Sequence, residues 1–282
     1  MQKRAFKQVD VFTAEAYRGN PLAVVLDGTG LSDDQMQHFA HWTKLSETTF
    51  LLPPTTDAAD YRVRIFTPGG ELPFAGHPTL GTCHAWLQAG GKAKRRDLIV
   101  QECKQGLVNL RRDGARLAFA APVSKRTAPG PAALAQVATA LGLKAEAILA
   151  ARTLDNGPVW LTLFVEDPNT VLALEPDHAQ LRAHGHKVGV AARYANARDG
   201  EPMLEVRAFA DPVGIPEDPV TGSLNASLAQ WLIDDGLMPA RYLAAQGTRL
   251  DRAGRVHVER DDHGQVWVGG ETVSCIEGTV LL

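Results

Sequence analysis

The second half of this chain repeats the order of elements of the first half. Residues 63–66 (Val-Arg-Ile-Phe) resemble residues 206–209 (Val-Arg-Ala-Phe), and both segments are typical of strands. Each is followed by a loop containing proline and glycine, and then by a helical pattern that ends in a Trp-Leu pair, Trp86 in the first half and Trp231 in the second. This repeat predicts two similar domains, and clefts between domains are common places for a functional site.

Length and composition limit the class of protein. The chain has 282 residues, of which 45% are hydrophobic and 22% charged, as expected for two globular domains. Its net charge of −3, without a basic patch, gives no support to nucleic-acid binding. No apolar run reaches the roughly 18 residues of a membrane span, and residues 1–8 lack the apolar core of a signal peptide. The sequence therefore predicts a cytoplasmic protein with neither nucleic-acid nor membrane partners.

Apolar periodicity and capping residues predict the remaining elements. Ser32 and Gln35 form a capping box for a helix that buries Met36. Strands are expected at 45–52 and 159–165, the second buried on both faces because it is almost wholly apolar. Further helices are expected at 78–88, 131–141, 177–184 and 224–236.

A segment rich in proline and small residues, 121–131, is predicted to be a linker. The predicted domains are therefore 1–121 and 131–282, with chain ends that can cross between them. Three scattered cysteines, Cys83, Cys103 and Cys275, are too few for a disulfide framework or a zinc site.

Two glycine-containing loops, 69–81 and 217–225, each lead into a helix. The unpaired backbone N–H groups and the positive dipole end of a helix N-terminus favour anions. Gly76, Gly222 and Ser223 are therefore predicted to bind the carboxylate of a small-molecule substrate, or an oxyanion that forms from it. The two loops are predicted to face each other across one active site.

Seven short motifs occur in order along almost the whole chain. They are Val9-Asp10-Val11-Phe12, Gly19-Asn20-Pro21, Leu45-Ser46-Glu47-Thr48, Phe66-Thr67-Pro68, Gly76-His77-Pro78-Thr79-Leu80, Asp218-Pro219-Val220-Thr221-Gly222-Ser223 and Gln246-Gly247. Together they resemble the PhzF (phenazine biosynthesis) family. The resemblance implies the diaminopimelate epimerase-like fold, a mixed α/β (α+β) architecture of two pseudo-symmetric domains. Each domain is a rolled mixed β-sheet around a central α-helix. Members are commonly homodimers, so the resemblance implies a homodimer here as well.

Epimerases of this parent fold use two opposed cysteine thiolates at the starts of the central helices. The matching positions of this sequence are assigned to Ala75 and Pro219, neither of which carries a proton. Cys83 lies well inside the predicted helix and is expected to belong to the core. A two-thiol racemase is therefore not expected.

Glu47 is the predicted acid–base group. It stands at the mouth of an apolar strand, where burial would raise the pKa of a carboxyl group toward the range useful for proton transfer. A glutamate in this position is otherwise an ordinary solvated residue, and the resemblance supplies the catalytic role: the family glutamate takes a proton from one carbon and returns it to another. Ser46 is predicted to assist in substrate binding.

Two further residues are predicted to be catalytic. His77 lies at a helix N-terminus, which lowers a histidine pKa and keeps the ring neutral, although it could merely cap the helix. Asp218 is held extended by Pro219 and is predicted to orient a substrate amine or hydroxyl, or to pair with His77. A plain turn aspartate is the alternative. Gly19-Asn20-Pro21 is interpreted as a turn.

The predicted function is that of an isomerase that needs no cofactor and no metal. Dinucleotide-binding, P-loop and nucleophile-elbow motifs do not occur in the sequence. Glu47 would move a proton, with a double-bond shift, on a small carboxylate such as a dihydro-hydroxyanthranilate-like compound. The alternatives are an epimerase or dehydratase that uses Glu47 with His77 or Asp218, and a non-catalytic carboxylate-binding protein of the same fold.

Overall fold

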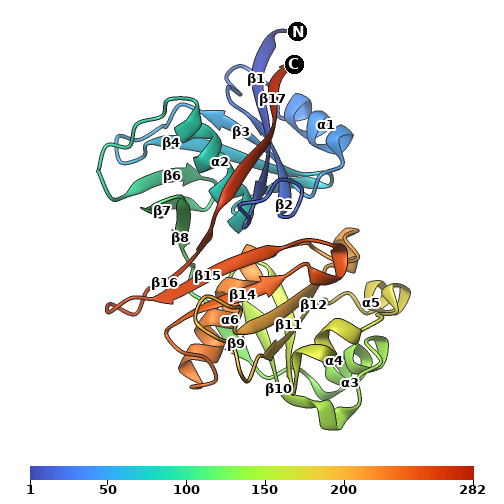
Figure 1. The fold of residues 1–282 in the computed structure, drawn as a ribbon. Coiled ribbons are helices and arrows are strands. Elements are labelled where there is room, and N and C mark those ends of the chain that lie inside the picture. The colour runs from blue at the N-terminus through green and yellow to red at the C-terminus, as the bar shows by residue number, and fades with distance from the viewer. The chain divides into compact units, whose positions relative to one another are not determined.

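The computed structural model describes all 282 residues, and its chain forms two compact units (Figure 1). Unit 1 comprises Met1–Ala120 and Gly269–Leu282, and unit 2 comprises Ala121–Val268. The final strand, β17 (Thr272–Leu281), lies antiparallel to β1 (Lys3–Val11), so both chain ends belong to unit 1. The predicted range 131–282 had assigned this strand to the second domain, while leaving open that chain ends cross.

Unit 1 is a mixed sheet around one helix. Its elements, besides β1 and β17, are β2 (Asn20–Val25), α1 (Asp33–Thr43), β3 (Thr48–Leu52), β4 (Tyr61–Thr67), β5 (Gly70–Leu72), α2 (Gly76–Gln88), β6 (Ile99–Cys103), β7 (Gly106–Asp113) and β8 (Arg116–Ala120). Strands β2 and β3 are parallel, β3 and β4 antiparallel, and β4 and β6 parallel. Helix α2 contacts β1, β2, β3, β8 and β17, so the sheet wraps around it.

Unit 2 is also a mixed sheet around one central helix, but its amino-acid sequence differs from that of unit 1. Its elements are β9 (Lys125–Thr127), α3 (Pro131–Ala140), a 3₁₀ turn (Ala145–Ala147), β10 (Ile148–Asp155), β11 (Val159–Val165), α4 (Pro168–Ala173), α5 (His178–His184), β12 (Lys187–Arg193), β13 (Leu204–Phe209), a 3₁₀ turn (Asp211–Val213), α6 (Gly222–Asp234), β14 (Arg241–Gln246), a 3₁₀ turn (Thr248–Leu250) and β15 (Gly254–Arg260). Strand β16 (Val266–Gly270) runs across the boundary between the units.

The strand directions confirm the predicted duplication. Strands β11 and β12 are parallel, β12 and β13 antiparallel, and β13 and β14 parallel. This is the succession of β2, β3, β4 and β6 in unit 1. In both units the central helix, α2 or α6, follows the antiparallel pair and precedes the last strand. None of the helices is long and apolar enough to cross a membrane.

Each central helix packs so closely on its sheet that the contact requires a glycine. A Cβ atom at Gly81 of α2 would lie 2.6 Å from Leu22 Cδ2 and 2.9 Å from Val11 Cγ2. In unit 2 the glycine is on the strand instead: a Cβ at Gly189 of β12 would lie 2.6 Å from Leu224 Cδ1 of α6. Side chains that interdigitate at this density leave no room for an added methyl group.

Several local predictions are confirmed. Ser32 and Gln35 make both hydrogen bonds of the capping box, and Met36 is buried. Cys83 lies in α2 and is fully buried, and β11 is buried except at its first residue.

The segment predicted to be a linker is not entirely irregular. It contains β9, which pairs antiparallel with β10. All three residues of β9 are exposed and polar, so this strand is held by backbone pairing and shows no apolar pattern from which it could be predicted.

Replacing Gly81 with Ala is expected to destabilise the protein by about 1 kcal/mol, the middle of the net range. An overpacking cost of about 1–3 kcal/mol, less the roughly 1 kcal/mol gained in helix propensity, leaves a net loss of up to about 2 kcal/mol. The matched control is Gly278→Ala in β17, where a Cβ would meet no atom within 4 Å. Urea unfolding should show a lowered midpoint for the first variant and one close to wild type for the second. Equal midpoints for both variants would contradict the packing account.

Candidate functional site

Glu47 lies in the turn that connects α1 to β3. Helix α1 ends at Thr43, and Lys44 adopts the left-handed conformation (φ 56°) that ends many helices. A hydrogen bond of 3.0 Å between Thr43 Oγ1 and Thr48 Oγ1 closes the turn. Ser46, which is half-buried, immediately precedes Glu47. The helix end at Lys44 and the hydrogen bond between Thr43 and Thr48 together hold the turn in place, and they thereby position the backbone of Glu47.

Glu47 and His77 meet at one edge of the sheet of unit 1. Because β2 and β3 run parallel, the first residue of β2, Asn20, lies at the same edge as Glu47, which precedes β3. His77, the second residue of α2, contacts both. Its Nε2 is 3.2 Å from Glu47 Oε2, and its Nδ1 is 3.4 Å from Asn20 Nδ2. The side chains of His77 and Glu47 are only 6% and 13% exposed.

The ring of His77 is neutral over the physiological pH range. Burial lowers the pKa of His77 from its ordinary value of 6.5 to about 3, against a smaller upward contribution from hydrogen bonding with the Pro21 backbone. The predicted direction of this pKa shift is therefore confirmed. Its main cause is burial, whereas the prediction had relied on the helix dipole.

Asn20 is a buried neighbour of His77 that the sequence interpretation missed, because it treated residues 19–21 as a turn only. Gly19 forms the turn: its N–H donates to Asp10 Oδ2 at 3.1 Å, and a Cβ there would lie 2.4 Å from the Val11 carbonyl oxygen. Asn20 itself is fully buried. The sequence did contain a signal for Asn20: it is a polar residue at the start of an apolar strand, and it belongs to one of the motifs shared with the family.

The two central helices begin without side-chain caps. The N-cap residue is Ala75 for α2 and Thr221 for α6, and in neither case does a side chain accept a hydrogen bond from the first turn. The sequence prediction had matched Ala75 with Pro219, which was wrong by two residues because α6 starts only after Thr221. The matching position thus carries an alcohol instead of a thiol.

Thr221 connects Asp218 to Gln246 in unit 2. The Thr221 hydroxyl donates to Asp218 Oδ2 at 2.7 Å and accepts from Gln246 Nε2 at 2.9 Å. Gln246 Oε1 accepts from the Thr221 backbone N–H at 2.9 Å. Gly247, whose φ is +88°, is required there, since a Cβ would lie 2.6 Å from the Pro219 carbonyl oxygen. The motif Gln246-Gly247 therefore positions the Asp218 loop.

The other predicted binding residues are the first residues of the two central helices. Gly76 begins α2, and Gly222 and Ser223 begin α6. Ser223 Oγ accepts a hydrogen bond from Trp160 Nε1 at 3.2 Å. The structure thus groups the predicted site residues by unit. Unit 1 holds Ser46, Glu47, Gly76 and His77, and unit 2 holds Asp218, Gly222 and Ser223.

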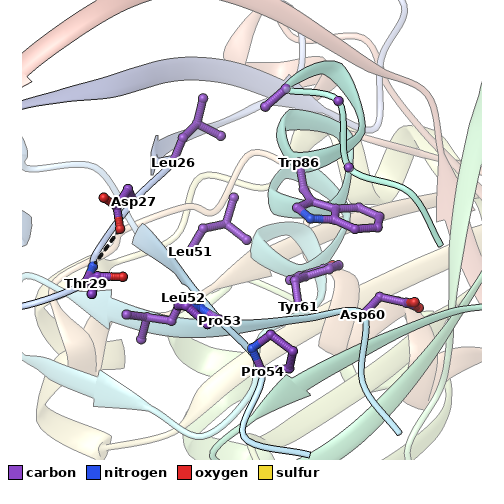
Figure 2. A pocket seen from close by; sticks show the side chains of 13 residues that line it. Leu26, Asp27, Thr29, Leu51, Leu52, Pro53, Pro54, Asp60, Tyr61 and Trp86 are labelled. Atoms are coloured by element: carbon purple, nitrogen blue, oxygen red, sulfur yellow. Dashed lines mark hydrogen bonds between the residues drawn. The ribbon is translucent and has the colours of Figure 1, made fainter. Parts of the chain in front are cut away.

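A separate pocket in unit 1 lies at the opposite end of α2 (Figure 2). It has a volume of about 480 Å³, and its lining includes Trp86, whose ring lies 4.9 Å from that of Tyr61, and the helix-terminal residues Ala89 and Gly90. With a rise of about 1.5 Å per residue, Ala89 and Gly90 are roughly 18–20 Å along the helix axis from His77. The lining contains none of the predicted site residues.

Clusters of three or more His, Cys, Asp or Glu side chains able to hold a metal ion do not occur in the structure. Cys83 cannot act as a base at neutral pH, because burial raises the pKa of its thiol to about 12 and the thiol stays protonated. The titratable groups at the helix starts are therefore Glu47 and His77 in unit 1 and Asp218 in unit 2.

Comparison with known proteins places the chain in a family. Residues 9–278 match the family described as phenazine biosynthesis-like protein, PhzC-PhzF. A Schizosaccharomyces pombe protein named antisense-enhancing sequence 1 is 36% identical over 99% of both chains. The trans-2,3-dihydro-3-hydroxyanthranilate isomerase of Pseudomonas aeruginosa is 32% identical over 97% of this chain and 98% of its own.

Solved structures agree on the fold. The Bacillus anthracis PhzF-family protein superposes with a TM-score of 0.86 over the full length of both chains at 22% identity. An Agrobacterium vitis hydroxyproline epimerase has a TM-score of 0.62 at 13% identity, covering 99% of this chain and 93% of its own. The chain therefore belongs to the phenazine biosynthesis-like (PhzF) family and has the predicted epimerase-like fold. It is an enzyme of the isomerase class.

The buried, neutral His77 makes a prediction about acid stability. Because its pKa is lower in the folded state, the unfolded state binds more protons between pH 6.5 and about 3. Stability is complete above pH 6.5 and decreases as the pH falls, with a contribution of up to about 1.4 kcal/mol per pH unit from this group. His77→Gln should unfold with a shallower pH dependence in this window.

The control is His38→Gln, on the exposed face of α1. Urea unfolding at a series of pH values should give this variant the wild-type slope. A His77→Gln variant with the full wild-type slope would show that His77 is not buried in its neutral form.

Proposed function

We propose that this protein moves a proton between two carbons of a small carboxylate, with Glu47 as the group that removes the proton and returns it. The observation that carries the proposal is the buried contact of 3.2 Å between Glu47 Oε2 and His77 Nε2. The relative named trans-2,3-dihydro-3-hydroxyanthranilate isomerase supports a cyclic, unsaturated amino acid as the type of substrate. Enzymes use a positioned carboxylate for this chemistry because it exchanges protons readily near neutral pH.

His77 is proposed to hold Glu47 in its carboxylate form. The amide nitrogen of Asn20 lies 3.4 Å from His77 Nδ1, and since an amide nitrogen only donates, this contact favours Nδ1 as the acceptor. A neutral imidazole then carries its single proton on Nε2, which lies 3.2 Å from Glu47 Oε2. Asn20 and His77 are positioning residues in this proposal, and Glu47 alone touches the transferred proton.

The opposite tautomer would assign another role to Glu47. If Nδ1 carried the proton and donated it toward the Pro21 backbone, Nε2 would be an acceptor, and only a protonated Glu47 could bond to it. Glu47 would then begin the reaction as an acid. The direct contact with Asn20 favours the first tautomer.

The proposed reaction balances without an added reactant. Glu47 removes a proton from a C–H bond, and that electron pair forms a new carbon–carbon double bond. The electrons of the original double bond accept a proton from the Glu47 carboxyl group at the far carbon, so the substrate is neither oxidised nor reduced. Solvent deuterium enters the product when this carboxyl proton exchanges before it is delivered. Backbone N–H groups at the start of α2, beside His77 and Glu47, are proposed to stabilise the negative charge that develops.

An epimerase is the second candidate, because the fold is shared with a hydroxyproline epimerase. The residues at the helix starts argue for the isomerase: Ala75 and Thr221 supply no thiol pair that could exchange protons on opposite faces of a carbon. Turnover in deuterium oxide separates the two reactions. The isomerase places deuterium on a carbon other than the one deprotonated, whereas an epimerase labels the same carbon with inverted configuration.

Glu47→Gln is expected to abolish solvent exchange while leaving the fold intact. Glutamine has nearly the same shape but accepts no proton, so kcat/KM should fall by about 10³-fold, within the range for losing a general base. The measurement is deuterium incorporation from deuterium oxide, followed by mass spectrometry, with trans-2,3-dihydro-3-hydroxyanthranilate as the first substrate.

The matched control is Glu146→Gln, at an exposed glutamate of unit 2. It should exchange at the wild-type rate. Exchange that persists in the Glu47→Gln variant would eliminate Glu47 as the base. Binding of the substrate by the wild-type protein without any exchange would instead support the carboxylate-binding alternative.

A further inference from the structure

One arginine in each unit makes the same set of contacts. Arg64 lies on β4 and Arg207 on β13, at matching places of the internal repeat. Arg64 Nε and Nη2 donate to the two carboxyl oxygens of Glu71, at 2.7 and 3.0 Å. Arg207 donates from the same two nitrogens to Glu217, at 3.0 and 2.8 Å. Such a two-bond fork fixes the orientation of the carboxylate as well as its distance.

The aromatic residue two positions along the strand contacts each arginine. The guanidinium carbon of Arg64 lies 5.0 Å from the centre of the Phe66 ring. In unit 2 the guanidinium carbon of Arg207 lies 5.0 Å from the centre of the Phe209 ring. Side chains two residues apart on a strand point to the same face, and a cation above an aromatic ring is attracted to it. A carboxylate and a ring therefore hold each guanidinium group in place.

The third guanidinium nitrogen connects each arginine to a helix that packs on the sheet. Arg64 Nη1 donates to Asp33 Oδ1, in the first turn of α1, at 2.6 Å. Arg207 Nη1 donates to the carbonyl oxygens of Val171 and Leu174, at the end of α4, at 3.1 and 2.8 Å. The two units therefore share this connection, although the groups that accept the hydrogen bonds differ.

In unit 1 the fork holds the segment that leads to His77. Glu71 lies in β5, and residues 73–75 connect this strand to α2, whose second residue is His77. Because each residue spans at most about 3.5 Å, so short a connection leaves little freedom between the strand and the helix start. A displacement of Glu71 is therefore expected to displace His77.

The strand register connects the same fork to Glu47. Glu71 of β5 lies opposite Phe66 of β4, and Phe66 lies opposite Thr48 of β3. Thr48 directly follows Glu47 in the chain. Glu47 therefore extends from the end of a row of paired residues that includes the carboxylate of the fork.

The fork of unit 1 is sheltered from water. The side chains of Arg64 and Glu71 are 20% and 18% exposed. Hydrogen bonding to Arg64 holds the pKa of the Glu71 carboxyl group below its ordinary value, so this group is ionised at neutral pH. Lys104 also approaches Glu71, at 3.5 Å, but it is exposed and makes a single contact. The bidentate geometry and the partial burial distinguish the fork from an ordinary surface ion pair.

Unit 2 has the same arrangement before its central helix. Glu217 directly precedes Asp218, in the loop that leads into α6. The side chains of Arg207 and Glu217 are only 5% and 9% exposed. A fork that recurs before both central helices indicates a role in placing the helix starts.

We propose that Arg64 is a positioning residue for the contact between Glu47 and His77. Its fork holds Glu71, and with it the strand that leads into α2. Its contacts with α1 and with the Phe66 ring hold that strand beside the row of residues that ends at Glu47. Arg64 takes no part in the proton transfer itself. The inference rests on the proposed function, because it names a residue that acts through the groups proposed there.

The test variant is Glu71→Gln in the full-length protein, which keeps the size of the side chain but removes the charge from the fork. Nitrogen NMR of ¹⁵N-histidine-labelled protein reports the His77 ring, and kinetics with trans-2,3-dihydro-3-hydroxyanthranilate separate kcat from KM. The His77 ring resonances should move from their wild-type positions. The value of kcat should fall about 10-fold with KM changed less than about 2-fold, since a misplacement of about 1 Å can cost about 10²-fold. Arg64→Lys should act alike, because lysine keeps the charge but cannot form the fork.

The matched control is Asp113→Asn, which breaks another ion pair of unit 1. Asp113 Oδ2 lies 2.8 Å from Arg116 Nη2, at an exposed position between β7 and β8. This variant should keep the wild-type kcat and the wild-type His77 resonances. Thermal unfolding of every variant identifies a merely structural role, which would lower the Tm of Glu71→Gln without moving the His77 resonances or kcat.

The outcomes separate this inference from the proposed function. Glu71→Gln protein with wild-type His77 resonances and wild-type kcat would overturn the inference and leave Glu47 as the base. Deuterium exchange that persists in Glu47→Gln would overturn the proposed function instead. In that case the His77 resonances of Glu71→Gln alone decide whether the fork positions this ring, because they are measured without substrate.

Discussion

The contact between His77 and Glu47 depends on where α2 begins. Gly81 lets this helix approach β1 and β2, so that its first turn reaches the edge at which β2 and β3 start. The same burial that permits the contact lowers the pKa of His77 to about 3 and keeps the ring neutral. A neutral ring supplies one proton and one acceptor site, and Asn20 Nδ2 lies 3.4 Å from Nδ1. Packing thereby determines protonation, and protonation determines the role proposed for Glu47.

Duplication gave the two units one framework with different chemistry. Each has an uncapped central helix packed tightly on its sheet, through Gly81 in unit 1 and Gly189 in unit 2. At the helix start, unit 1 has a titratable pair, and unit 2 has a network of amides and hydroxyls around Thr221. This asymmetry fits a reaction in which a single base moves one proton. A symmetric pair of proton donors, as in a two-thiol epimerase, would require matching groups at both helix starts.

The sequence predicted the elements that depend on local pattern. The repeat, the capping box at Ser32 and the core position of Cys83 all follow from residue spacing, and the structure confirms them. The role of Glu47 was assigned by family resemblance and stays a prediction. The contact of Asn20 with His77 could not be assigned from sequence, because it depends on strand register and on how close a helix lies. Pro219 was matched wrongly with Ala75 because the start of a helix after a proline-containing loop is set by tertiary contacts.

The most direct test of the account is the protonation of the His77 ring. Nitrogen NMR of ¹⁵N-histidine-labelled protein, with the resonance assigned by comparison with His77→Gln, reports whether Nδ1, Nε2 or both carry a proton. The account predicts a neutral ring protonated at Nε2 from about pH 8 down to about pH 5, well above the folded-state pKa of about 3. A ring that becomes doubly protonated near pH 6.5, or one protonated at Nδ1, would contradict the claim that buried His77 holds Glu47 as the carboxylate base.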